Sequence, residues 1–138
     1  MWSQRIRYAL RVLVWMALHR GRRVSARELA TENDIPVKYL EAILADLRTA
    51  GFVQSTKGAT GGYALSNDPA ALSLIQVVRV LEPKLIDSSP AVLSGGVAPE
   101  EPVLAGIADA VEQRLSDLTV LDAALQWQRA GGSMDYVI

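Results

Sequence analysis

The sequence predicts a mainly α-helical fold with one small β-hairpin, and three observations support this prediction. Apolar residues recur every three or four positions over most of the 138 residues, as they do on one face of a helix. The pattern changes between about residues 52 and 65, where two short strand-like runs flank a glycine-rich loop. Half of the residues are apolar and 21% are charged, so the chain can bury a core of ordinary size.

The first helix is predicted over about 3–19, where Ser3 can cap the start and Gly21 follows the end. The apolar run 12–18 inside it has seven residues, which is far below the roughly 20 that span a bilayer. Arg11 also interrupts what would be the core of a signal peptide. We therefore expect a cytoplasmic protein with no membrane partner.

The second helix is predicted over about 26–32, after the pair Ser25 and Glu28. In this capping box the serine hydroxyl accepts from the third amide of the helix, while the glutamate reaches back to the serine amide. Asn33 and Asp34 then favour a turn, because these residue types tolerate left-handed backbone better than most.

A third helix is predicted over about 36–50, with Pro36 in its first turn, where no amide hydrogen is needed. The runs 52–56 and 62–65 favour two strands, and the loop 57–61 joins them into a hairpin. The order of helix, short helix, turn, helix and hairpin is typical of a winged helix-turn-helix.

The second half predicts three more helices, at about 73–82, 101–117 and 120–129. Residues 83–100 are rich in Pro, Gly and Ser and favour a loop. We divide the chain accordingly into a winged helix-turn-helix domain (1–82), a linker loop (83–100), two C-terminal helices (101–130), to which the family resemblance described below assigns dimerisation, and a flexible tail (131–138).

In a winged helix-turn-helix, the helix at about 36–50 enters the major groove of DNA and meets base edges near its start. Lys38 lies on that leading part and can contact phosphate or guanine, and Glu41 can accept from a cytosine amino group. Lys57 at the hairpin tip is placed to follow an adjacent groove or the backbone. These positions predict a double-stranded DNA partner.

The charge distribution supports this interpretation. Residues 1–65 carry ten basic and five acidic side chains, whereas residues 66–138 carry four and ten. Such asymmetry indicates one portion that faces a polyanion and another with a different task. The chain has no Cys and one His, which excludes thiolate metal sites, catalytic thiols and a multi-histidine site within one chain. No catalytic set is recognisable either, so we expect neither an enzyme nor a metal site.

Three segments, YALRVLVWMAL, VSARELATENDIPVKYLEAILADLRTAGFVQS and KGATGGYALSNDP, resemble the Rrf2 family of winged-helix transcriptional regulators. The resemblance is dense from about residue 7 to 82. It implies a homodimeric repressor that binds a palindromic operator, with base contacts from Lys38 and Glu41, a phosphate contact from Tyr39, and Lys57 in the minor groove. The candidate DNA-binding residues are Ser25, Val37, Lys38, Tyr39, Glu41, Arg48, Lys57 and Gly61.

The resemblance also implies that the helix at about 101–117 forms the dimer interface, in agreement with an apolar stripe there. The stripe consists of Leu104, Ile107, Val111, Leu115 and Leu118. Sensors of this family hold an iron–sulfur cluster with three cysteines in the loop before that helix, and this chain has none. We therefore expect no cysteine-ligated cluster and no other cofactor, and a signal that comes from a small molecule or a partner protein.

Two alternatives stay open at the level of sequence. Trp15 and Trp127 either pack in the core or line a small-molecule pocket between the DNA-binding and dimer portions. The whole chain could instead be a winged-helix interaction module that docks a protein and no longer binds DNA specifically. The sparse charge of the hairpin tip and the acidic second half favour this second function.

Overall fold

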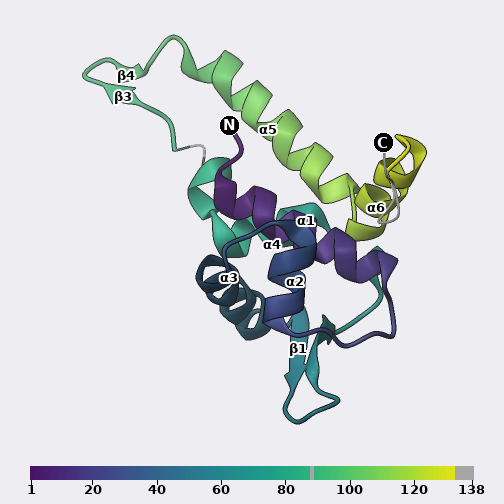
Figure 1. Cartoon of the computed structure of the whole chain (residues 1–138). Helices are drawn as coiled ribbons and strands as arrows, with labels where there is room; N and C mark the ends of the chain where they lie inside the picture. Colours follow the sequence, from purple (N-terminus) through teal and green to yellow (C-terminus); the bar gives the residue numbers. More distant parts are fainter. Residues whose placement is uncertain (88, 133–138) are drawn as a thin grey trace.

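The computed structural model describes residues 1–87 and 89–132 (Figure 1). Within them the chain forms six α-helices and two antiparallel hairpins, so the prediction of a mainly helical fold with a small hairpin is confirmed. The elements are α1 (Gln4–Leu18), α2 (Ala26–Asn33), α3 (Val37–Thr49), β1 (Val53–Thr56), β2 (Gly62–Leu65), α4 (Leu74–Leu81), β3 (Val92–Leu93), β4 (Gly96–Val97), α5 (Glu101–Asp117) and α6 (Val120–Arg129). Two 3-10 turns cover Pro69–Ala71 and Pro83–Ile86.

The core lies where α1, α2, α3 and α4 meet. Each helix contributes side chains that solvent barely reaches, among them Leu13, Leu29, Leu44 and Val77. These residues recur at helical spacing along each element, so every helix turns one apolar face inward. The inward faces fix α3 against the bundle and leave its opposite face exposed.

The helix caps agree with the sequence in part. Ser3 accepts from the Ile6 amide at 3.2 Å, and Ser25 accepts from the Glu28 amide at 3.1 Å. The predicted return bond from Glu28 to the Ser25 amide is wrong, because the Glu28 carboxylate pairs with Arg22 at 2.8 Å. Pro36 is the residue before α3 rather than in its first turn, with extended backbone at ψ 130°.

The hairpin β1–β2 is tied to the helical body by a third extended segment. Val53 pairs with Leu65 at the base of the hairpin, and Val24 forms a bridge to Tyr63. The amide of Val24 donates to the Tyr63 carbonyl at 3.0 Å, and the Tyr63 amide donates back at 2.7 Å. The wing is therefore joined to the loop that leads into α2.

The second half of the chain departs from the predicted loop. Residues of 83–100 form the 3-10 turn Pro83–Ile86 and the hairpin β3–β4, which projects beyond the helical body next to the start of α5 (Figure 1). The first strand of this hairpin is only two residues long, too short for an alternating pattern to reveal it. Between these elements Asp87 accepts from the Ser89 hydroxyl and amide, and these bonds hold the pKa of the Asp87 carboxyl below its usual value.

The C-terminal helices pack back onto the first domain. Arg79 of α4 pairs with Glu112 of α5 at 2.9 Å, and Ser73 forms a β-bridge to Thr119. After Thr119 the chain turns, and α6 packs against α1. In the part of the chain that the structure describes, no helix is long and apolar enough to cross a membrane.

The cap at the start of α6 can be tested by substitution. Thr119 accepts from the Asp122 amide at 3.1 Å, and the Asp122 carboxylate accepts from the Thr119 amide at 2.9 Å. Thr119→Ala removes the cap, so we expect the free energy of unfolding in urea to fall by about 1 kcal/mol. Ser116→Ala is the matched control, since its hydroxyl bonds only the Glu112 carbonyl of its own helix. Equal values for the two variants would contradict the assignment.

Candidate nucleic-acid interface

The outward face of α3 is polar and exposed. Lys38 and Glu41 are three residues apart on this face, and both side chains are exposed. Leu40 and Leu44 lie on the opposite face, fully buried in the core. Val37, the first residue of α3, is also exposed. The structure thus presents the start of α3 to any partner that approaches this side.

Two predicted residues lie at the edges of this face. Tyr39 packs edge-on against Tyr8 of α1, with ring centroids 5.3 Å apart, and keeps part of its surface exposed. Arg48 lies at the other edge, where its guanidinium donates to the Ser55 hydroxyl of β1 at 3.4 Å. The two edges therefore border α1 and the wing respectively.

The wing carries Lys57 at its exposed tip, and the geometry of its turn requires glycine at position 61. The Gly61 amide donates to the Gly58 carbonyl at 3.1 Å, and a Cβ at Gly61 would overlap the carbonyl of Thr56. The Gly61 amide is thus used inside the turn. Because Gly61 has no side chain, the two strands can approach closely enough for the turn to form.

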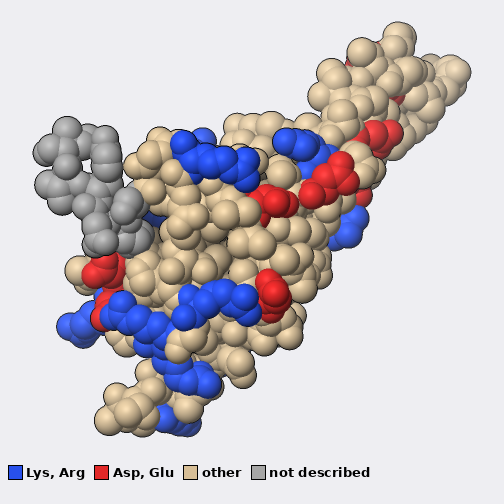
Figure 2. Space-filling view, turned by 90° about the vertical axis from the view of Figure 1, so that its right-hand side faces the viewer, with Lys and Arg blue, Asp and Glu red and all other residues tan. Residues whose placement is uncertain are grey.

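Two exposed arginines beside the wing were not among the predicted contacts. Arg23 precedes Val24, the residue bridged to the wing, and Arg27 lies in the first turn of α2 beyond the cap Ser25. Figure 2 shows Lys and Arg gathered over the lower part of the molecule, toward the wing at the bottom. In the sequence these two arginines contributed to the net positive charge of residues 1–65. No motif singled them out as DNA contacts.

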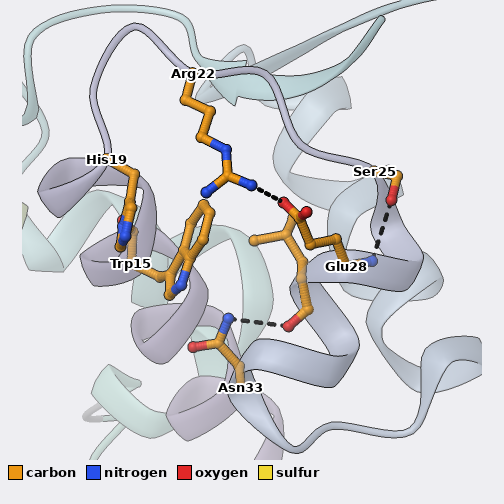
Figure 3. Close-up of polar contacts among 7 residues, drawn as sticks. Trp15, His19, Arg22, Ser25, Glu28 and Asn33 are labelled. Atoms are coloured by element: carbon orange, nitrogen blue, oxygen red, sulfur yellow. Dashed lines mark hydrogen bonds and ion pairs between the residues drawn. The ribbon is translucent and has the colours of Figure 1, made fainter. Parts of the chain in front are cut away.

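Trp15 lies at the centre of a second group of side chains (Figure 3). Its ring is 2% exposed and stacks on His19, with centroids 3.9 Å apart and planes at 13°. The Arg22 guanidinium lies 5.6 Å from the ring centroid. The Trp15 Nε1–H is buried and has no hydrogen-bond partner among the described residues, an arrangement that costs about 1–3 kcal/mol.

The two tryptophans that the sequence singled out line the same groove. It has a volume of about 610 Å³ and lies between α1, the end of α2 and α6. Trp15 lies in its wall almost fully buried, and Trp127 of α6 is 47% exposed. Asn33 also lines the groove and donates from Nδ2 to the Leu29 carbonyl at 2.9 Å.

The apolar stripe of α5 is divided by the fold. Leu115 is 7% exposed and belongs to the chain's own core, and Val111 and Leu118 pack against that core. Leu104 and Ile107 are 50% and 58% exposed. Of the five predicted interface residues, only the two nearest the start of α5 therefore offer most of their surface to another chain.

The residues present do not fit an iron–sulfur cluster held by cysteines. The sequence contains no Cys, and the described residues include no group of three or more His, Asp or Glu side chains placed to hold a metal ion. The segment before α5, where the predicted family carries its cluster, supplies Ser, Ala, Val, Gly and Glu, none of which is a soft ligand.

Comparisons with known proteins agree with this geometry. Residues 2–125 match the Rrf2 family, described as iron-dependent transcriptional regulators. The HTH-type transcriptional regulator CymR of Bacillus subtilis is 33% identical over 123 residues, which cover 88% of each chain.

Two solved structures extend the likeness to the whole fold. The global cysteine regulator CymR of B. subtilis superposes with a TM-score of 0.81 at 32% identity, over 91% of this chain and 97% of that one. IscR of T. potens superposes with a TM-score of 0.79 at 28% identity, over 96% and 92%. The helices, the wing and the long α5 are therefore shared with winged-helix regulators.

Proposed function

The chain belongs to the Rrf2 family of transcriptional regulators, and on this basis we propose that it is a dimeric repressor that binds a palindromic operator. The observation that carries the proposal is the exposed polar face of α3, held against a buried core and bordered by the wing. A helix presented in this way can enter a major groove while the wing follows the neighbouring backbone. No catalytic set accompanies this face in the described residues.

The contacts follow from the chemistry of each side chain. Lys38 donates to guanine O6 and N7 or to phosphate, and Glu41 accepts from a cytosine amino group. Arg48, Ser25 and Lys57 contact the backbone, because basic groups and free hydroxyls near the wing meet phosphates first. Arg23 and Arg27 join this backbone set, and Val37 and Tyr39 border the base-reading face.

A second copy of this chain covers the exposed apolar end of α5. Val103, Leu104 and Ile107 lie along it, and Val92 and Val97 of the neighbouring hairpin are exposed as well. The top of the molecule, where these elements lie, carries almost no charged side chain in Figure 2. An exposed apolar end of this kind marks a site for another protein. In a twofold dimer it places two α3 helices about 34–36 Å apart, one turn of DNA.

The signal that controls such a repressor comes from a small molecule or a partner protein. Without cysteine the chain cannot form the cluster of its iron–sulfur relatives, so the sensor must use other chemistry. The groove between α1 and α6 is the place we propose for that sensor.

DNA binding is tested with the full chain on DNA from its own upstream region. Lys38→Ala is expected to weaken binding by about 1–3 kcal/mol and to relax the preference at one base pair. Lys57→Ala is expected to weaken binding to all DNA sequences alike. It should also lower the slope of log binding constant against log salt concentration by about 0.9. Lys84→Ala, at an exposed lysine in the 3-10 turn before the hairpin β3–β4, is the matched control.

Two results would contradict the proposal. One is equal binding by all three variants. The other is sequence-independent binding that disappears at about 100 mM salt, since such binding is purely electrostatic. A stable protein partner together with no selected DNA motif would favour the interaction module instead.

A further inference from the structure

We propose that the groove between α1, the end of α2 and α6 binds an apolar amino acid in its zwitterionic form. This inference rests on the proposed function only for its regulatory meaning, because the binding itself needs no DNA. The volume of about 610 Å³ lies within the range of small-molecule sites. Three features of the lining define the ligand: an apolar wall, charged side chains of both signs that form no ion pair with each other, and a buried donor.

The apolar wall comes from two helices. Leu10, Val14 and Leu18 follow at intervals of four along α1, and Trp127 and Ala123 face them from α6. Trp127 keeps almost half of its surface exposed, although a large aromatic ring gains most by being covered. A ligand with an aromatic or branched aliphatic side chain would cover this ring.

The lining of the groove carries side chains of both charges, from α1 and from the end of α2. Arg7 and Arg11 lie one turn apart on α1, whereas Glu32 and Asp34 lie at the end of α2. The Arg11 guanidinium donates to the Asn33 carbonyl at 2.9 Å, and the Arg7 Nε donates to the Trp2 carbonyl at 3.4 Å. None of the four forms an ion pair within the described residues.

Side chains of opposite charge in one groove suit a ligand that carries both charges itself. A carboxylate would lie beside Arg7 and Arg11, where guanidinium groups offer paired donors. An ammonium group would lie beside Glu32 and Asp34. A ligand with one charge alone leaves the side chains of one sign without a partner.

The buried donor is the Trp15 indole nitrogen. Trp15 lines the groove, and its nitrogen edge turns toward Asn33 (Figure 3). Because this N–H has no partner among the described residues, an acceptor on the ligand would satisfy it. The ligand carboxylate, drawn to the arginines of the same helix, supplies that acceptor.

The position of the groove explains how such a ligand would act on DNA binding. Asp34 has left-handed backbone at φ 54° and ends α2, two residues before Pro36 caps α3. Trp127 belongs to α6, which directly follows the dimer helix α5. A ligand that contacts both Asp34 and Trp127 would favour one arrangement of the turn relative to the dimer helices. It would thereby change the fraction of molecules whose shape fits the operator.

The test is titration calorimetry on the full chain with L-phenylalanine, L-leucine and L-tryptophan, up to 10 mM each. We expect saturable binding of at least one of them. Two analogues of L-phenylalanine, phenylacetate without the ammonium and phenethylamine without the carboxylate, are expected to bind at least ten-fold more weakly. No saturation by any amino acid, or equal binding of phenylacetate, would overturn the proposal.

The site is located with variants. Trp127→Ala is expected to weaken binding at least ten-fold, and Trp15→Phe, which keeps an aromatic ring of smaller size and removes the N–H, about five-fold. Trp2→Ala and Trp2→Phe are the matched controls at a tryptophan outside the groove. Unchanged binding by Trp127→Ala would overturn the location. A chain that binds the amino acid yet ignores operator DNA would overturn the proposed function and leave this site standing.

Discussion

Gly62→Ala is expected to lower the free energy of unfolding by about 2–4 kcal/mol and to remove most specific DNA binding. Gly62 has φ at +135°, a backbone conformation open almost only to glycine. A Cβ there would also lie 2.7 Å from the carbonyl carbon and oxygen of Val24. The strain and the close approach act together at the point where the wing joins the body.

The loss has a structural consequence beyond stability. The reciprocal hydrogen bonds between Val24 and Tyr63 must lengthen to make room, and these bonds hold the wing beside α2. Urea unfolding measures the first effect and a gel-shift with operator DNA the second. Gly95→Ala is the control, since Gly95 has ordinary φ and no atom within 4 Å of its added Cβ. A Gly62→Ala protein as stable as the control would contradict the geometry of the wing.

The double change Leu104→Asp and Ile107→Asp is expected to produce a folded monomer with at least 100-fold weaker operator binding. At least half of each side chain is exposed in the single chain, so the substitutions cost little free energy of folding. In a dimer they would place four unpaired carboxylates in an apolar contact, where burial of charge is costly. Loss of the second α3 removes half of the operator contacts.

Sedimentation measures the assembly, and circular dichroism shows that the monomer is folded. Gln113→Asp adds a carboxylate on the opposite face of α5 and serves as control. A double variant that stays dimeric would place the interface elsewhere. A monomer that binds the operator with full affinity would contradict the palindromic, dimeric mode.

The local structure followed from the sequence because its signals act between neighbours. Ser3 and Ser25 cap their helices as predicted, and Asp34 takes the left-handed backbone that an Asn-Asp turn favours. The inward faces of the four helices of the first domain were also predicted, since spacing along one helix decides which side chains share a face. These rules gave the position of Lys38 and Glu41 on the exposed face of α3.

The predictions that differed from the structure concerned contacts that spacing along a single helix does not specify. Glu28 pairs with Arg22 rather than with its own cap because the loop before α2 brings that arginine close. Leu115 fits the periodicity of an exposed dimer stripe, yet it is buried in the core of its own chain. Periodicity identifies an apolar face, but it carries no information on which element covers that face.

By itself the sequence determined the class of the protein. Helix caps, turn residues and the IP-x-x-YLE recognition segment are local, and the absence of Cys excludes a cysteine-held cluster without any coordinates. Only the tertiary structure decided which surfaces are free, because burial depends on contacts between residues far apart in the chain. It divided the stripe of α5, and it brought Trp15 and Trp127, 112 positions apart by their residue numbers, to one groove.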